Sequence, residues 1–157
     1  MHRVFCLATM KIGEYMPFLT NTVARRIQWG ECDPAGIVFY PRYFEMFDAS
    51  TTAMFSVATS LTKYQMFETY KFAGYPMVDT RARFLIPCRF GDDITIETTM
   101  TEAKRSSFNI THHLKKDDAL AVEAFEARVW VGRDPSDASK IKSQPIPAEV
   151  IEKLSRA

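Results

Sequence analysis

The side chain best suited to chemistry is the carboxylate of Asp33, in the stretch of residues 28–44. A strand-like apolar run precedes it, Pro34 and Gly36 impose a turn, and Pro41 suits the first position of a helix. A carboxylate in such a turn supplies a base or a nucleophile. The helix N-terminus supplies free backbone N–H groups that stabilise an oxyanion. This combination is typical of acyl transfer.

The elements around this stretch must belong to one core. With 157 residues, 46% of them hydrophobic, the chain is long enough for one domain and too short for two. We expect a single domain over 21–157 after a weakly structured extension over 1–20. The net charge of +1 gives no general attraction to nucleic acid or membranes. No apolar run of about 18 residues and no secretory signal is found, which predicts a cytoplasmic protein.

Cysteines and histidines give no sign of a metal site. The three cysteines are odd in number and have no paired spacing, which argues against a disulfide framework or a zinc cluster. Cys32 adjoins Asp33, but no histidine lies near it in sequence, so we expect a small buried hydrophobe. His112 and His113 are adjacent on an expected strand and must point to opposite faces. We therefore expect no metal and no prosthetic cofactor.

Helical periodicity predicts one long central helix from Pro41 to about Ala58, apolar on most sides and therefore buried. A looser helix is expected over 63–72, and a short C-terminal helix from Pro147 to about Leu154.

Alternation with period two predicts the strands. The first is expected over 22–29, and four more over 78–86, 94–100, 108–114 and 121–131. Their short connections suit only antiparallel neighbours. No element is assigned to the polar residues 132–145. Phe84, Phe125 and Trp130 cannot all face one side of the sheet, so we also expect an oligomer.

One ordered block carries a family resemblance. The chain resembles the hotdog-fold thioesterases, and most closely the 4-hydroxybenzoyl-CoA thioesterase group, in these residues: Gly30-Glu31-Cys32-Asp33-Pro34-Ala35-Gly36-Ile37-Val38, Tyr40-Pro41, Tyr43 and Asp48-Ala49. The similarity covers about Arg25 to Ile151. It implies the α+β hotdog fold, in which a curled antiparallel five-stranded sheet wraps around one long buried helix. It also implies an acyl-CoA substrate, no cofactor besides the CoA of that substrate, and a homodimer or homotetramer with sites at the subunit interface.

By this resemblance, Asp33 is the catalytic carboxylate, acting as nucleophile on the thioester carbonyl or as base for a water. The backbone N–H of Tyr40 polarises the carbonyl oxygen. The alternative for an isolated aspartate before Pro34 is an Asx turn or a cap.

Asp48 lies eight residues after Tyr40, about two helical turns further on. In the hydroxybenzoyl enzymes the matching aspartate lies near the acyl group, where a carboxylate accepts a hydrogen bond from a phenol. The alternative is a helix carboxylate satisfied by Thr51 or Thr52.

A basic turn between two expected strands, Lys104-Arg105-Ser106-Ser107, resembles the stretch that receives the phosphates of CoA in this family. The alternatives are a solvated hairpin and a patch for an acyl-carrier protein. Arg128 is a weaker candidate for the same phosphate-binding role.

Tyr75 is the clearest departure from the family. It stands where the 4-hydroxybenzoyl enzyme has a small hydroxyl residue, in a segment that lines the acyl pocket across the subunit boundary. A larger side chain should reshape that pocket, although Tyr75 also suits a core or interface position.

The favoured function is hydrolysis of 4-hydroxybenzoyl-CoA or a related aryl-CoA. The alternatives are a thioesterase for short aliphatic acyl-CoA or acyl-carrier protein, and a non-catalytic acyl-thioester binding module. A hydratase on this fold would need a histidine near the turn or the central helix, and none occurs between His2 and His112.

Overall fold

The computed structural model describes residues 18–155, so residues 1–17 of the expected extension lie outside the described part. Thr20, the last residue of that expected extension, already belongs to the first strand, β1.

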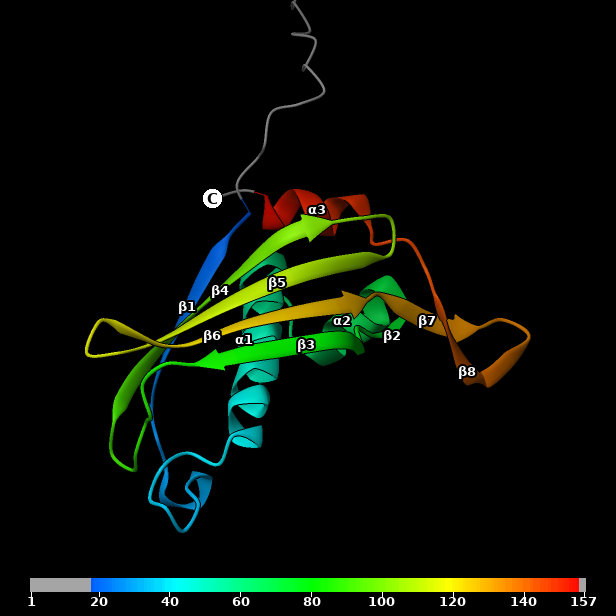
Figure 1. Ribbon diagram of the computed structural model, residues 1–157. Helices are drawn as coiled ribbons and strands as arrows, with labels where there is room; N and C mark the ends of the chain where they lie inside the picture. Colours follow the sequence, from blue (N-terminus) through cyan, green and yellow to red (C-terminus); the bar gives the residue numbers. More distant parts are fainter. Residues whose placement is uncertain (1–17, 156–157) are drawn as a thin grey trace, which may run out of the picture.

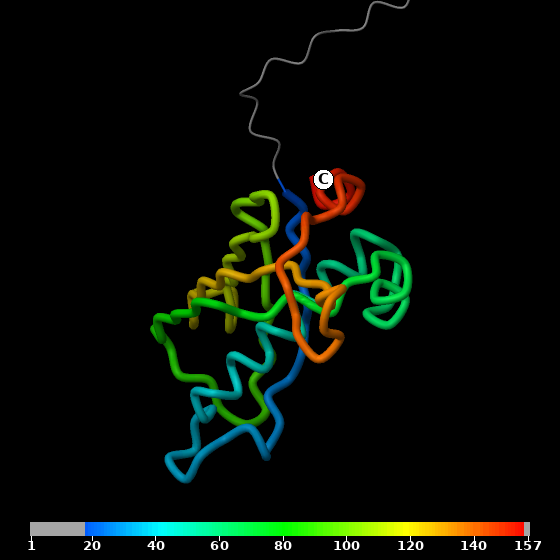
Figure 2. Tube along the Cα trace, turned by 90° about the vertical axis from the view of Figure 1, so that its right-hand side faces the viewer, coloured from blue at the N-terminus to red at the C-terminus, as the bar shows by residue number. Residues whose placement is uncertain are grey.

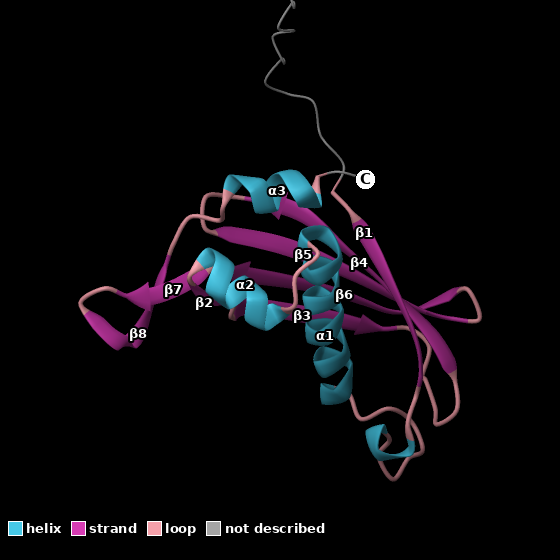
Figure 3. Ribbon diagram, turned by 180° about the vertical axis from the view of Figure 1, so that it is seen from behind, coloured by secondary structure: helices cyan, strands magenta, loops and turns pink. Residues whose placement is uncertain are grey.

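A five-stranded antiparallel sheet forms the main layer, in the order β1 (Thr20–Arg26), β4 (Asp93–Ala103), β5 (Ser107–Lys116), β6 (Ala119–Val129) and β3 (Met77–Phe84). It curls around helix α1 (Pro41–Thr59), which crosses the inner face of the sheet (Figures 1 and 3). The predicted hotdog architecture is confirmed.

Helix α1 begins at Pro41, where the missing N–H costs no hydrogen bond, as the sequence predicts. Phe47, Met54 and Phe55 on its sheet-facing side are completely buried. The sequence predicts burial of most of the helix surface, and this overestimates the buried part, because Ala49 and Val57 lie exposed on the opposite side. Helix α1 is therefore amphipathic in the single chain.

A second, smaller sheet extends from one end of the main one. It consists of β2 (Phe72–Gly74), β7 (Val131–Asp134) and β8 (Asp137–Ser143), and the β7–β8 hairpin projects at the right of Figure 1. The polar residues 132–145, to which the sequence assigned no element, thus form most of a hairpin. The expected strand over 121–131 is divided at Trp130, whose N–H donates to the Ser106 carbonyl at 2.8 Å and whose carbonyl accepts from Gln144 N–H at 3.0 Å.

Two other expectations about strands are wrong. Strand β3 pairs with β6 and not with β4, so the loop between β3 and β4 crosses from one part of the sheet to another. Strand β1 ends at Arg26, and Trp29 begins a short 3₁₀ turn, η1 (Trp29–Glu31), with 77% of its surface exposed. In β6 the apolar Phe125 and Val129 point outward, while Glu126 and Arg128 point into the core.

The remaining helices cover one end of the fold. Helix α2 (Lys63–Tyr70) starts from a capping box, in which the Thr62 hydroxyl accepts from Gln65 N–H. Helix α3 (Ala148–Leu154) lies beside the start of β1, as Figures 1 and 2 both show, and Leu19 N–H donates to the Leu154 carbonyl at 2.6 Å. In the described part of the chain, no helix is long and apolar enough to cross a membrane.

Candidate active site

The turn that carries Asp33 is a closed loop between η1 and α1, at the bottom of Figure 1. Cys32 and Val38 form a β-bridge, and Asp33 N–H donates to the Ile37 carbonyl at 2.9 Å. Gly36, at a φ of 75°, allows the chain to reverse. The Asp33 Oδ1 atom accepts from Ala35 N–H at 2.8 Å, an Asx turn. Its Oδ2 atom accepts no hydrogen bond from residues 18–155, so half of the carboxylate is free to react.

Tyr40 offers a free backbone donor at the N-terminus of α1. Arg42 N–H donates to the Phe39 carbonyl at 2.8 Å and Tyr43 N–H to the Tyr40 carbonyl at 3.1 Å, while Pro41 has no N–H. Tyr40 N–H has no acceptor within the described chain. A donor at a helix N-terminus stabilises developing negative charge. Tyr40 N–H is therefore free to act as the predicted oxyanion donor.

The loop between β3 and β4 is hydrogen-bonded to this turn. Val38 N–H donates to the Cys88 carbonyl at 2.9 Å, and Arg89 Nη1 donates to the Gly36 carbonyl at 3.3 Å. Asp92 holds that loop by accepting from Arg89 N–H at 2.7 Å and pairing with Lys116 at 2.6 Å. Burial opposes ionisation of Asp92, but these hydrogen bonds outweigh it and lower its pKa.

An apolar pocket of about 260 Å³ adjoins Tyr40. It is lined by Ile37, Val38, Tyr40, Tyr43, Phe84, Leu85, Ile86 and Pro87. These residues come from the turn, the start of α1 and the end of β3, which is why sequence proximity alone did not reveal the pocket. It provides a largely apolar surface that includes Tyr40.

Asp48 lies further along α1 and is paired with an arginine. Its Oδ1 atom accepts from Arg128 Nη1 at 2.7 Å. The alternative of a threonine partner is wrong, since Thr51 donates to Glu126 and Thr52 bonds to the Tyr75 hydroxyl at 3.0 Å. The Asp48 side chain is 51% exposed, so it remains accessible to a ligand.

Tyr75 is buried beside Asp48 and forms the wall of a groove. Its ring stacks on Phe55 with centroids 5.0 Å apart, and Lys63 Nζ lies 5.1 Å from the Tyr75 centroid. Burial raises the pKa of the Tyr75 hydroxyl. The groove has a volume of about 400 Å³, and its wall includes Asp48, Tyr75 and Arg128. The structure thus brings two predicted binding residues together.

Arg128 is almost completely buried and is paired with Glu126 and Asp48, so it is unsuited to the expected phosphate-binding role. Its Nε atom donates to Glu126 Oε2 at 2.8 Å, and the Nε2 atom of His112 lies 3.3 Å from the same oxygen. His112 in turn bonds to Thr98 through Nδ1 at 2.9 Å. Sequence analysis missed this network. The sequence does contain a signal for it. Glu126 and Arg128 carry opposite charges and are two residues apart on one strand, so both side chains lie on the same face.

The buried Glu126 predicts a pH dependence of stability. Burial raises the pKa of Glu126, but His112 and Arg128 lower it more, so the net shift is downward. In the unfolded chain the Glu126 carboxyl has a pKa of about 4.3. The stabilisation that the lowered pKa of the folded state provides is therefore present above that pH and is lost as the pH falls below it. We expect the free energy of unfolding, measured with urea between about pH 3 and 6, to fall less steeply in Glu126→Gln than in the unmodified chain. Equal slopes would contradict this assignment.

The Lys104–Ser107 turn lies at the end of the sheet away from Asp33, at the upper right of Figure 1. Lys104 and Arg105 are exposed there, and Lys104 N–H donates to the Ser107 carbonyl at 2.8 Å. A single chain therefore does not bring this turn and Asp33 together.

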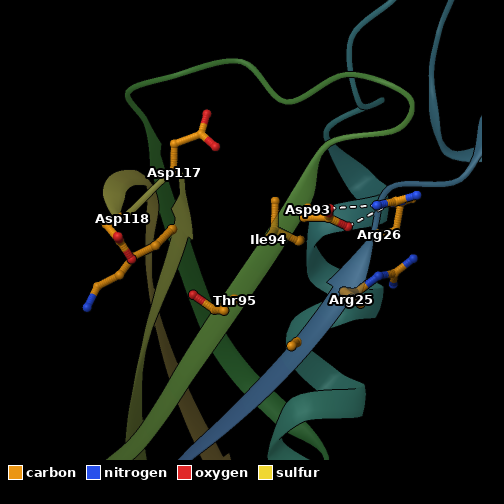
Figure 4. Close-up of a pocket in the computed structure, with 9 residues that line it drawn as sticks. Arg25, Arg26, Asp93, Ile94, Thr95, Asp117 and Asp118 are labelled. Carbon is orange, nitrogen blue, oxygen red and sulfur yellow. Dashed lines mark hydrogen bonds and ion pairs between the residues drawn. The ribbon is translucent and has the colours of Figure 1, made fainter.

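Another groove, of about 490 Å³, crosses β1, β4 and the β5–β6 turn (Figure 4). Its charges are mixed, and Arg26 donates to both carboxylate oxygens of Asp93 at 2.8 and 2.7 Å. It contains none of the predicted site residues, and its main ion pair is already satisfied.

Comparison with known proteins gives consistent matches to thioesterases. A family model described as the thioesterase-like superfamily matches residues 27–154. The 4-hydroxybenzoyl-CoA thioesterase of Pseudomonas sp. (strain CBS-3) is 32% identical over 139 residues, which cover 85% of this chain and 96% of that protein.

Solved structures agree with the sequence matches. A mutant of 4-hydroxybenzoyl-CoA thioesterase complexed with 4-hydroxybenzoyl-CoA is 30% identical, with a TM-score of 0.79 over 86% of this chain and 98% of the other. A gentisyl-coenzyme A thioesterase is 30% identical, with a TM-score of 0.72 over 83% of this chain and 99% of the other.

Proposed function

The chain belongs to the thioesterase-like superfamily, and from that premise we propose that it hydrolyses an aryl-CoA thioester to the free acid and CoA. The favoured substrate is 4-hydroxybenzoyl-CoA or a related hydroxylated aryl-CoA. Two similar proteins, at 32% and 30% identity, are thioesterases for 4-hydroxybenzoyl-CoA and gentisyl-CoA.

The turn containing Asp33, directly before α1, is the observation that carries this proposal. As a nucleophile, Asp33 attacks the thioester carbonyl, expels CoA as the thiolate and leaves an acyl-aspartyl anhydride that water hydrolyses. As a base, it removes a proton from a water that attacks the same carbonyl, and that proton passes to the departing thiolate. In either route, Tyr40 N–H stabilises the oxyanion.

Two subunits are needed to complete this site. The apolar pocket beside Tyr40 includes Phe84, at the end of β3, whereas the groove of Asp48 and Tyr75 includes Met77, at its start. Strand β3 is an edge of the main sheet, and two copies paired antiparallel along it would bring the Phe84 end of one beside the Met77 end of the other. We infer a homodimer or homotetramer whose active sites span this boundary.

The remaining binding roles follow the chemistry of CoA. The groove containing Asp48 and Tyr75 would receive the acyl group. The exposed cations Lys104 and Arg105, with hydroxyls from Ser106 and Ser107, would contact the phosphates on the surface of the assembly.

A direct assay tests the proposal. CoA release from 4-hydroxybenzoyl-CoA, benzoyl-CoA and a short aliphatic acyl-CoA would be followed with a thiol reagent. We expect turnover of the aryl esters and little of the aliphatic one. Turnover of the aliphatic ester alone would assign the protein to a different specificity, and binding of aryl-CoA without any turnover would favour a binding module.

The β3 edge gives a separate prediction. Val78 on β3 is 65% exposed in the single chain, and a lysine there would place a charge at the inferred boundary. We expect Val78→Lys to shift the protein toward monomer in light scattering and to lower activity. The control is Thr22→Lys on β1, the opposite edge of the same sheet, which should keep the assembly intact. A monomeric unmodified protein with full activity would contradict the inference.

A further inference from the structure

Arg128 is fixed in the core by contacts on two sides of its guanidinium. Its side chain is 3% exposed, Nε donates to Glu126, and Nη1 lies 3.4 Å from the Tyr75 carbonyl as well as 2.7 Å from Asp48. The guanidinium also lies 5.7 Å from the centroid of the Tyr75 ring. Two of its three nitrogens, Nε and Nη1, are held by partners on β6, on α1 and on the segment before β3, so it has little room to move.

Asp48, in contrast, has one side in the core and one in the groove. Its Oδ1 atom is bound by Arg128, and its Oδ2 atom accepts nothing from any residue in the described chain. The groove therefore meets a carboxylate whose orientation is set from behind by a buried cation.

From this geometry we propose that Arg128, anchored by Glu126, is a positioning residue that fixes Asp48 to accept a hydrogen bond from a hydroxyl on the acyl group. The inference rests on the proposed function, and it adds two buried residues, Arg128 and Glu126, to the determinants of substrate choice. Glu126 lies outside the groove, and Arg128, which lines it, acts on the acyl hydroxyl through Asp48.

The physical reason is preorganisation. A half-exposed aspartate held by nothing samples several rotamers, and ordering it on binding costs conformational entropy. The contact with Arg128 removes most of that freedom before the substrate arrives. Glu126 is needed because a lone buried guanidinium would be costly, and because its contact with Nε sets the plane of the fork that faces Asp48.

The test compares 4-hydroxybenzoyl-CoA with benzoyl-CoA, which lacks the hydroxyl. The discrimination ratio is kcat/KM for the first divided by kcat/KM for the second. Arg128→Met combined with Glu126→Gln removes both charges together, so that no buried charge is left alone. We expect this double variant to lower the ratio by about 10-fold or more, and Asp48→Asn to lower it by a similar factor.

A mutant cycle separates positioning from structural damage. On an Asp48→Asn background the double change should leave the ratio as it is, because the group it positions is already gone. Thr59→Val serves as control. Thr59 is buried on the same helix and donates to the Phe55 carbonyl at 2.7 Å, so its loss should lower stability and leave the ratio unchanged.

Each outcome has one meaning. A folded double variant with an unchanged ratio would overturn the positioning role, and so would an unmodified protein that hydrolyses both esters equally well. An unmodified protein that hydrolyses neither would contradict the proposed function and the inference together.

Discussion

Asp33→Asn is expected to lower kcat for aryl-CoA hydrolysis by about 10²–10⁴-fold, the range typical of losing a positioned base or nucleophile. The amide of asparagine performs neither role at neutral pH. Its side-chain oxygen still accepts from Ala35 N–H, as Asp33 Oδ1 does at 2.8 Å, so the Asx turn should persist. Steady-state CoA release, with thermal unfolding recorded alongside, measures both effects.

Asp117→Asn is the matched control for that experiment. Asp117 is exposed in the β5–β6 turn at a φ of 50°, a conformation that asparagine tolerates well. We expect its activity to equal that of the unmodified chain. If Asp33→Asn also kept full activity, the catalytic assignment of Asp33 would be wrong.

Trp130→Ala should give the largest loss of stability, about 3–5 kcal/mol, which is typical of removing a large buried aromatic side chain. Trp130 is fully buried, and its ring stacks on that of Phe72 with centroids 4.3 Å apart. The ring centroids of Phe55 and Tyr70 each lie 6.1 Å from the Trp130 centroid. It therefore joins the second sheet to both helices α1 and α2. For a chain of this size, Tm should fall by about 6–20 °C, measured by calorimetry.

Trp29→Ala provides the comparison for the same residue type. Trp29 is 77% exposed, and its ring meets Phe90 in a T-shaped contact at 5.7 Å. An exposed site of this kind should change stability by no more than about 0.5 kcal/mol. A similar Tm for the two variants would contradict the central packing role of Trp130.

Local signals were sufficient where they agreed with packing. Pro41 and the apolar period after it predicted α1 to within one residue at its C-terminal end. The block around Asp33 predicted a turn followed by a helix, and the structure has both. Both features depend on residues that are neighbours in the sequence, so the sequence alone was enough to predict them.

Long-range contacts were beyond sequence reasoning. The apolar alternation of β6 suggested a core face, but β3 and β5 place Ala124, Glu126 and Arg128 inward, where α1 supplies Asp48 as a partner. The pairing of β3 with β6 likewise depends on the whole sheet closing, because nothing in the loop between β3 and β4 specifies which edge the chain must reach.

The division of one long strand at Trp130 has a consequence for how this protein can change over evolution. The hairpin of β7 and β8 contributes Val131 and Ile141 to the groove of Asp48 and Tyr75, yet it belongs to the second sheet and lines no pocket with Tyr40. Substitutions or insertions in this hairpin can therefore alter the groove while the turn of Asp33 keeps its geometry. An engineer who wants a new substrate range has in this hairpin a separate module to diversify.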